Sequence, residues 1–231
     1  MTIDFYPATR YVEPLFGISP DGIESDAIAI HTVKRNQLLF EKGENSKGVF
    51  TIISGQAILT VPETGKIVEI LDSGAFFGEE ALFQVGRIFM ARVTIGGKFA
   101  VLDPDKVTAK DELIKKAMFH LYERQERLVE DISCLKSMPP LQRLAKLILT
   151  IPQVSKGESK VKLPWRKHMM AERIGVRTET FSRLIPSLRD HGAEMDGEWL
   201  VIFNLSALHH FVTNRPDQWR LRKSSPKRAL C

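Results

Sequence analysis

The stretch from residue 166 to residue 192 constrains this chain most, because apolar side chains recur there with helical spacing on both sides of a glycine. Before Gly175, one helical face carries Met170, Ala171 and Ile174. After it, apolar residues follow the i, i+3, i+4, i+7 repeat of an amphipathic helix: Phe181, Leu184, Ile185 and Leu188. The pattern predicts two short helices joined by a tight turn.

The second predicted helix also has a coherent polar face. Glu179, Ser182 and Arg183 are spaced i, i+3, i+4, so they project to the same side. Arg can bond guanine O6 and N7 together, Glu can accept from cytosine N4, and Ser can donate or accept. This face suits the reading of DNA bases. A helical hairpin with an ordinary solvated face shows the same spacing, so the flanking sequence has to decide.

The sequence on both sides of the two predicted helices favours the DNA-binding interpretation. A short strand is predicted over residues 161–164, and a β-hairpin turning at Asp196 and Gly197 follows the helices, which makes a winged helix-turn-helix. Residues 139–231 hold 17 Lys and Arg against 8 Asp and Glu, a formal charge of +9, whereas residues 1–138 hold 16 against 20, a charge of −4. A basic C-terminal module is expected to bind a polyanion, and double-stranded DNA is the predicted partner.

Length and composition indicate the general class. With 231 residues and 43% hydrophobic content, the chain suits one large or two modest globular domains, and the change of charge between its two parts favours two. The first residues lack the basic and apolar regions of a signal peptide, and no run of about 18 apolar residues occurs, so we expect a cytoplasmic protein without a membrane span. Two cysteines far apart in sequence, Cys134 and Cys231, do not predict a disulfide framework.

The N-terminal half has a β pattern. Short runs of β-forming residues are separated by turn residues, with a glycine in most of the turns, and they cover residues 27–33, 37–40, 48–53, 56–61, 67–71, 92–95 and 99–102. Many short strands of this kind are typical of a sandwich, roll or barrel. Its interior is expected either to hold a ligand or to be filled by its own side chains.

A long helix is predicted over residues 104–137, with a 4,3 apolar repeat. The a and d positions are Ile114, Met118, Leu121, Gln125, Leu128, Ile132 and Leu135. About three heptads predict a parallel homodimer, with Gln125 as the polar residue that sets the register. A helix lying along its own β domain is the alternative. Phe119 and Tyr122 fall off the repeat and are expected to pack on the β domain, and Met138, Pro139 and Pro140 are expected to form a hinge.

The predicted fold is therefore α+β. It consists of a jelly-roll-like β-roll over residues 1–103, a dimerisation helix with hinge over 104–138, and a winged helix-turn-helix with a basic tail over 139–231.

This order of parts resembles the Crp/Fnr superfamily of bacterial transcription regulators over nearly the whole chain. Two segments carry the resemblance: Gly-Glu-Glu-Ala-Leu-Phe at 78–83 and Glu-Thr-Phe-Ser-Arg at 179–183. In the Fnr-like branch, the Glu, Ser and Arg of the second segment read a TTGAT-type half-site of a palindrome. The resemblance implies that Glu179, Ser182 and Arg183 do so here.

The resemblance has further implications. Arg177, Thr178 and Lys167 are expected to contact DNA nearby, with Lys167 and Arg177 on phosphates, and RNA polymerase is an expected partner. Residues 168–183 are also similar to the nitric-oxide-responsive, denitrification-regulating branch, some of whose members use haem. Pro186 departs from the family pattern, since it removes an amide inside the recognition helix and is expected to kink it.

The effector region departs from the family as well. Relatives that bind cyclic nucleotides continue from Gly-Glu to an Arg-Ser/Thr-Ala sequence, in which Arg neutralises the phosphate. Here the two positions before Ala91 are Phe89 and Met90, so cyclic AMP is not expected. Gly78, Glu79, Phe89 and Met90 mark the candidate effector pocket, next to Phe76 and Phe77, and would suit an apolar ligand. A loop shift that brings Arg87 or Arg92 to a phosphate is the alternative.

Two other kinds of cofactor are known as effectors in this family. An iron–sulfur cluster is not expected, because it needs about four thiolates and the chain has two cysteines. Haem needs an axial ligand, for which His31, His120 and Cys134 are candidates, as are Met90 and Met118. No metal site is assigned.

Catalytic signatures are not found: a phosphate-binding loop, an HExxH helix and a GxSxG elbow do not occur, and an enzyme is not expected. Two alternatives to an effector-controlled regulator stay open. One is a ligand-binding roll whose C-terminal module contacts a protein partner, and the other is a constitutive regulator without effector.

Overall fold

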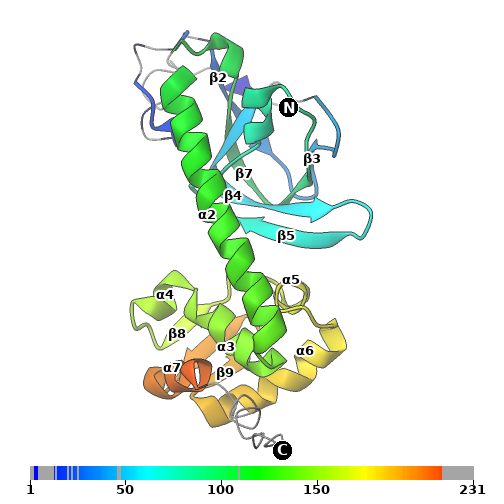
Figure 1. Ribbon diagram of the computed structural model, residues 1–231. Helices are drawn as coiled ribbons and strands as arrows, with labels where there is room; N and C mark the ends of the chain where they lie inside the picture. The colour runs from blue at the N-terminus through cyan, green and yellow to red at the C-terminus, as the bar shows by residue number, and fades with distance from the viewer. Residues whose placement is uncertain are drawn as a thin grey trace, which may run out of the picture. The chain divides into compact units, whose positions relative to one another are not determined.

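The computed structural model describes residues 3–4, 13, 15–19, 21, 23–24, 26–45, 48–108 and 110–214. The chain forms two compact units, residues 1–129 and 130–231, and the boundary lies inside its longest helix (Figure 1). The predicted division after residues 103 and 138 is a different one and stays a prediction. The predicted basic tail, residues 220–228, lies outside the described residues.

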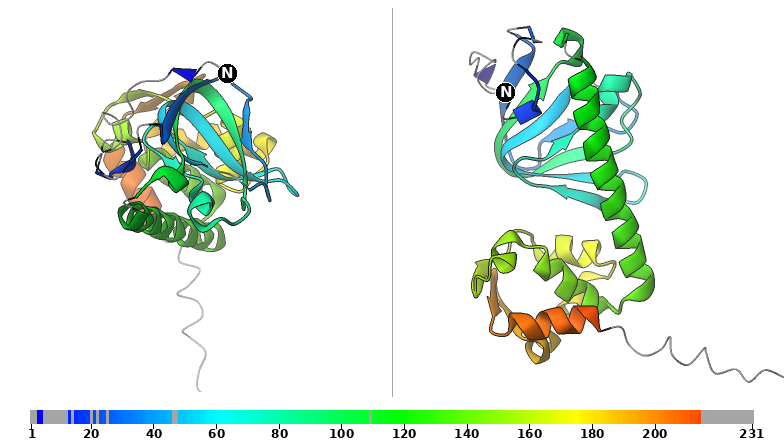
Figure 2. Two further views of the ribbon diagram at one scale, coloured as in Figure 1. Left: turned by 90° about the horizontal axis from the view of Figure 1, so that it is seen from above. Right: turned by 60° about the vertical axis from the view of Figure 1, so that its left-hand side comes forward.

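The first unit is an antiparallel sheet that curves on itself (Figure 2). The strands follow the order β1-β2-β7-β4-β5, with β3 on β7 and β6 on β4. Their bounds are β1 Ile3–Asp4, β2 Ile28–Val33, β3 Leu38–Phe40, β4 Val49–Val61, β5 Lys66–Leu71, β6 Phe76–Phe77 and β7 Met90–Leu102. The predicted β-roll is confirmed.

The predicted breaks inside β4 and β7 are wrong, because each is one strand of 13 residues. The pairing of these two strands shifts register between Ile52 and Ala57, near the predicted turn at Ser54. A Cβ on Gly97 would lie 2.1 Å from the Ser54 carbonyl oxygen. The glycines that resembled turns therefore allow two strands to approach closely at a bulge.

Two apolar clusters fill the first unit. One lies inside the roll and contains four phenylalanines, Phe40, Phe50, Phe77 and Phe99. The other joins the sheet to the first turns of the long helix through Phe16, Phe76, Leu113 and Ala117. Each fully buried side chain of this size contributes roughly 1.5–3 kcal/mol.

The long helix begins later than predicted. Pro104–Lys106 is a separate 3-10 turn, η3, in which the carboxylate of Asp103 accepts from the amide of Asp105 at 3.1 Å. The helix α2 runs from Lys110 to Ser137. Phe119 and Tyr122 are exposed, so the expectation that they pack on the roll is wrong. They lie off the stripe of Leu113, Ala117 and Arg124 that α2 buries.

The second unit is a winged helix-turn-helix. Its elements are α3 Pro140–Leu149, α4 Pro152–Ser155, β8 Lys160–Lys162, α5 Lys167–Arg173, α6 Thr178–Leu184, the 3-10 helix η4 Ile185–His191, β9 Ala193–Asp196, β10 Trp199–Ile202 and α7 Leu205–Thr213. The sheet order is β8-β10-β9. The predicted helical pair and the hairpin after it are confirmed.

The break after α2 is bridged by side chains of α3. Arg143 Nη1 donates to the carbonyl oxygens of Leu135 at 3.2 Å and Met138 at 3.0 Å. Lys146 Nζ lies 2.5 Å from Glu130 Oε1. These contacts tie the last turns of α2 to α3, so a hinge at Pro139 would have to break them. In the described part of the chain, no helix is both long and apolar enough to cross a membrane.

Candidate functional site

The helix α6 is held in place by its apolar face. Phe181 is completely buried and packs in one cluster with Ile174 of the turn after α5 and Leu188 of η4. Because this anchor points inward, the opposite face of α6 must point to solvent.

The structure leaves all six predicted DNA contacts exposed: Lys167, Arg177, Thr178, Glu179, Ser182 and Arg183. It brings Glu179, Ser182 and Arg183 together on one face of α6, while Arg177 caps this helix and Lys167 begins α5. Neither Glu179 nor Arg183 has a side-chain hydrogen bond or ion pair to another described residue. Ser182 Oγ donates to the Thr178 carbonyl at 3.0 Å, so its lone pairs remain as acceptors.

Pro186 changes the recognition helix in a different way from the predicted kink. The α-helix ends at Leu184, and the chain continues as the 3-10 helix η4. Proline has no amide for the i−4 carbonyl, which explains why the α-helical bonding stops here. The α-helical reading surface is therefore short.

The wing carries an exposed pair of a basic and an aromatic residue, Lys160 and Trp199, that the sequence analysis did not name. Lys160 Nζ lies 5.1 Å from the ring centre of Trp199, which is exposed on β10. The two residues lie on neighbouring strands, since β8 pairs with β10. The alternation of β10, with Leu200 and Ile202 buried, was the signal for an outward Trp199.

The acidic turn of the roll follows β6. Gly78 has φ +83°, and the 3-10 helix η2, Glu79–Phe83, begins directly after it. A Cβ on Gly78 would lie 2.8 Å from Arg87 Nη1, so a larger residue would clash there. The carboxylates of Glu79 and Glu80 are buried, with only 3% and 8% of each residue exposed. Buried carboxylates need partners.

Arg87 is the partner of Glu80. Its Nη1 lies 3.1 Å from Glu80 Oε2 and also donates to the Gly78 carbonyl, and Nη2 donates to the Gly48 carbonyl at 2.6 Å. The guanidinium stacks 4.3 Å from the ring centre of Phe40. Burial lowers the pKa of Arg87, against the pull of Glu80. A loop shift that offers Arg87 to a phosphate would break all these contacts.

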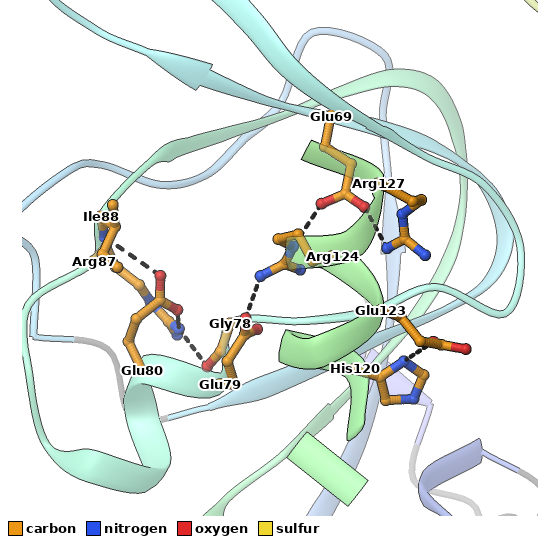
Figure 3. A network of polar contacts seen from close by, with 10 residues as sticks. All are labelled: Glu69, Gly78, Glu79, Glu80, Arg87, Ile88, His120, Glu123, Arg124 and Arg127. Carbon is orange, nitrogen blue, oxygen red and sulfur yellow. Dashed lines mark hydrogen bonds and ion pairs between the residues drawn. The ribbon is translucent and has the colours of Figure 1, made fainter. Parts of the chain in front are cut away.

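Arg124 is the partner of Glu79 (Figure 3). It extends from α2, donates through Nη1 to Glu79 Oε1 and donates through Nε to Glu69 Oε2 at 2.7 Å. Arg127 Nη2 reaches the other oxygen of Glu69 at 2.9 Å. Burial acts to lower the pKa of Arg124, but Glu79 and Glu69 outweigh it and raise that pKa. Burial raises the pKa of Glu79, against the attraction of Arg124.

Sequence reasoning missed this network. The available signal was an arginine at position 124, in line with Leu113 and Ala117 on the buried stripe of an otherwise solvated helix.

The aromatic residues of the predicted effector region belong to two different clusters, and the effector pocket itself stays a prediction. Phe89 is half-buried and packs against the cluster inside the roll, together with Phe77. Phe76 belongs to the other cluster and stacks on His120 of α2, with ring centres 5.0 Å apart. Adjacent residues of a strand point to opposite faces, which separates Phe76 from Phe77. Met90 is half-buried, with its sulfur 3.9 Å from Arg92 Nη2.

Of the haem-ligand candidates, His31 lies on β2, and His120 and Cys134 lie on α2. His31 is half-buried in β2, and burial lowers its pKa. Burial is also the first cause that lowers the pKa of His120, whose Nδ1 lies 3.4 Å from Glu123. Cys134 Sγ lies 3.0 Å from Lys146 Nζ. No group of three or more His, Cys, Asp or Glu that could hold a metal ion occurs among the described residues.

The predicted dimer seam is an exposed apolar stripe on α2. Met118, Leu121, Gln125, Ile132 and Leu135 are exposed, whereas Ile114 and Leu128 are half-buried. Val129 is exposed beside them and was missed, because it falls outside the a and d positions. An exposed stripe of this kind is typical of an interaction surface.

Comparison with known proteins agrees with this layout. A model of the cyclic nucleotide-binding domain matches residues 30–109, and a model of the Crp-like helix-turn-helix domain matches residues 142–211. The chain belongs to the Crp/Fnr family of transcription regulators. Proteins of this family are transcriptional regulators rather than enzymes.

Several relatives of this regulator are known. The cAMP-activated global transcriptional regulator CRP of Pasteurella multocida is 21% identical over 187 residues, which cover 75% of this chain and 90% of that protein. The structure of FixK2 from Bradyrhizobium japonicum matches with a TM-score of 0.69 at 16% identity, over 82% of this chain and 99% of that one. A transcriptional regulator of the CRP/FNR family from Thermus thermophilus gives 0.63 at 23% identity, over 81% and 100%. At these identities, the likeness to the two solved structures shows the fold alone.

The pairing of Arg87 with Glu80 yields a stability prediction. Replacement Arg87→Met should lower the free energy of unfolding by about 3–5 kcal/mol, because Glu80 is left buried without its cation. Urea denaturation measures this loss. The double variant Arg87→Met, Glu80→Gln should lose less than the single variant. An equal loss in both would show that Arg87 acts through packing rather than charge.

Proposed function

We propose that this regulator reads a TTGAT-like palindrome as a homodimer through Glu179, Ser182 and Arg183. The observation that carries the proposal is the exposed polar face of α6, whose opposite face is anchored by Phe181. The segment lies within the Crp-like helix-turn-helix match. Arg183 is free to bond guanine, and Ser182 presents an acceptor.

Contacts to the DNA backbone are assigned to residues around this face. Arg177 and Thr178 stand at the start of α6, and Lys167 stands at the start of α5, all exposed. Side chains of this kind position a protein on DNA without reading sequence. The formal charge of +9 over residues 139–231 supports this role.

The homodimer is assigned to the exposed stripe of α2. A two-fold reader has to hold its recognition helices about one DNA turn apart, roughly 34 Å. A parallel pairing of α2 through Met118, Leu121 and Ile132 would supply this symmetry, with Gln125 setting the register. RNA polymerase is the further protein partner that we propose, in the cytoplasm, where DNA and polymerase meet.

Cyclic AMP does not fit the residues of the roll. Phe89 and Met90 stand where a phosphate would need a cation and a donor, and Arg87 is already bound to Glu80 and two carbonyl groups. We therefore propose control by something other than cyclic AMP. Haem with nitric oxide and an apolar small molecule are the effector classes that the sequence leaves open.

One observation favours a regulator that needs no effector. Four phenylalanines occupy the interior of the roll: Phe40, Phe50, Phe77 and Phe99. The ring centres of Phe50 and Phe77 lie 5.2 Å apart. The guanidinium of Arg87 lies over the ring of Phe40. The chain's own side chains thus fill much of the space inside the sheet.

The base-reading role of Arg183 is testable. Replacement Arg183→Ala should cost about 1–3 kcal/mol on a duplex with the palindrome and less on random DNA, since a base contact is lost. Lys167→Ala is the control and should weaken both complexes alike, as a phosphate contact would. Fluorescence anisotropy at several salt concentrations measures both. Equal losses on both duplexes for Arg183→Ala would make it a phosphate contact.

The dimer seam has a matched control next to it. Met118 and Phe119 are equally exposed, at 61% and 60%, but only Met118 belongs to the seam. Met118→Asp should raise the dimer dissociation constant about tenfold or more, because a charge enters an apolar interface. Phe119→Asp should leave it near the wild-type value. Sedimentation equilibrium measures both, and an equal effect of the two changes would contradict the assigned seam.

The effector proposal is tested with purified protein. DNA affinity should not change when cyclic AMP is added. Optical spectra before and after haem titration, with ferrous, CO and NO forms, test the haem option. A sharp stoichiometric Soret band that shifts with the gas and alters DNA affinity would establish a haem sensor, with His31, His120 and Cys134 as the residues to mutate. DNA binding without any addition, and without specific haem uptake, supports the effector-independent regulator.

A further inference from the structure

The acidic turn of the roll depends on a cation from another element. Glu79 lies at the start of η2 and is almost completely buried. Arg87 compensates its neighbour Glu80 from within the roll, whereas the cation that contacts Glu79 is Arg124, 45 residues away on α2. The charge balance of the turn is therefore completed only when α2 is in place.

Arg124 binds two elements of the roll at once. One edge of its guanidinium contacts Glu79 of η2, and Nε contacts Glu69 of β5 at 2.7 Å (Figure 3). Arg124 is itself buried, with 9% of the residue exposed. A planar guanidinium satisfied by two carboxylates fixes the orientation of both, which a single point charge cannot do.

Other charged and aromatic groups lie beside the ion pair of Arg124 and Glu79. Glu69 is shared with Arg127, whose side chain is half exposed, and Glu80 adds a like charge beside Glu79. His120 lies one turn before Arg124 on α2 and stacks on Phe76, directly ahead of the turn. The ion pairs of α2 with η2 and β5 come from Arg124 and Arg127, whereas its apolar contacts with β6 and η2 begin earlier, at Leu113 and Ala117.

We propose that Arg124 is a built-in ligand of the acidic turn, which couples η2 to the proposed dimerisation helix. Arg124 is thus a positioning residue: it acts on DNA binding through the placement of α2 against the roll. This inference rests on the proposed function, because its readout in DNA affinity requires that the regulator reads the palindrome as a dimer.

The experiment removes the guanidinium and then supplies it from solution. Replacement Arg124→Ala leaves a gap between Glu79 and Glu69 that ethylguanidinium can enter. We expect the dissociation constant for the palindrome duplex to rise roughly tenfold, a usual size for coupling between two parts of a protein. Ethylguanidinium chloride should restore the affinity, whereas an equal concentration of sodium chloride should not. Arg127→Ala is the matched control and should have little effect, since exposed ion pairs contribute little.

A second readout needs no DNA. Amide hydrogen exchange of residues 79–83 and 66–71 should become faster in Arg124→Ala and return toward the wild-type rate with ethylguanidinium. An unchanged exchange rate in Arg124→Ala would contradict the proposal that Arg124 holds the acidic turn. Faster exchange with unchanged DNA affinity would contradict the proposed coupling of this turn to DNA binding. If the wild-type protein binds the palindrome no better than random DNA, the proposed function is refuted. The hydrogen-exchange result would still decide whether Arg124 holds the turn.

A variant from the other partner covers the case in which Arg124→Ala does not fold. Glu79→Gln keeps the shape of the side chain but removes the charge that Arg124 binds. It should also speed exchange in residues 79–83, but ethylguanidinium should not reverse the change. Rescue of Glu79→Gln by ethylguanidinium would contradict the assigned pairing.

Discussion

The burial of carboxylates at the acidic turn is the constraint on which the first unit depends. Glu79 and Glu80 leave water when the roll closes, and each needs a cation within the fold. Arg87 supplies one from the next loop and Arg124 supplies the other from α2. The same two arginines thus join the turn, the sheet and the long helix, and the aromatic cluster packs around the first of them.

In the second unit, one face of α6 packs into the core and the other faces solvent. Phe181 is the buried anchor of the helix, whereas the side chains of Glu179 and Arg183 have no partner among the described residues. The α-helix ends at Leu184, two residues after Ser182 and just before Pro186, so the α-helical face available to a DNA groove is short. For the proposed palindrome, reading by so few residues would make the proposed dimer important, because two half-sites together supply specificity that one helix lacks.

Much of this architecture could be predicted because its signals are local. The winged helix-turn-helix was predicted from helical spacing around Gly175 and from the turn at Asp196, and the structure confirms it. The errors arose where a local signal had two meanings. The break predicted between residues 95 and 99 contains Gly97, which allows β7 to pass close to Ser54. Phe119 was expected to pack on the roll, yet it lies off the stripe that α2 buries and is exposed. The roles of the DNA-reading and seam residues stay predictions.

The sequence by itself determined the order of the parts, the apolar stripe of α2 and the polar set on α6. The resemblance to the family added that Phe89 and Met90 depart from the Arg-Ser/Thr pair of relatives that bind cyclic nucleotides. These follow from periodicity and from residue type at a matched position. Only the tertiary structure decided which partners the buried arginines meet. Arg124 and Glu79 are 45 residues apart, and Arg87 and Gly48 are 39 apart. No periodic pattern encodes such pairs, since they arise only when the sheet curves and α2 packs against it.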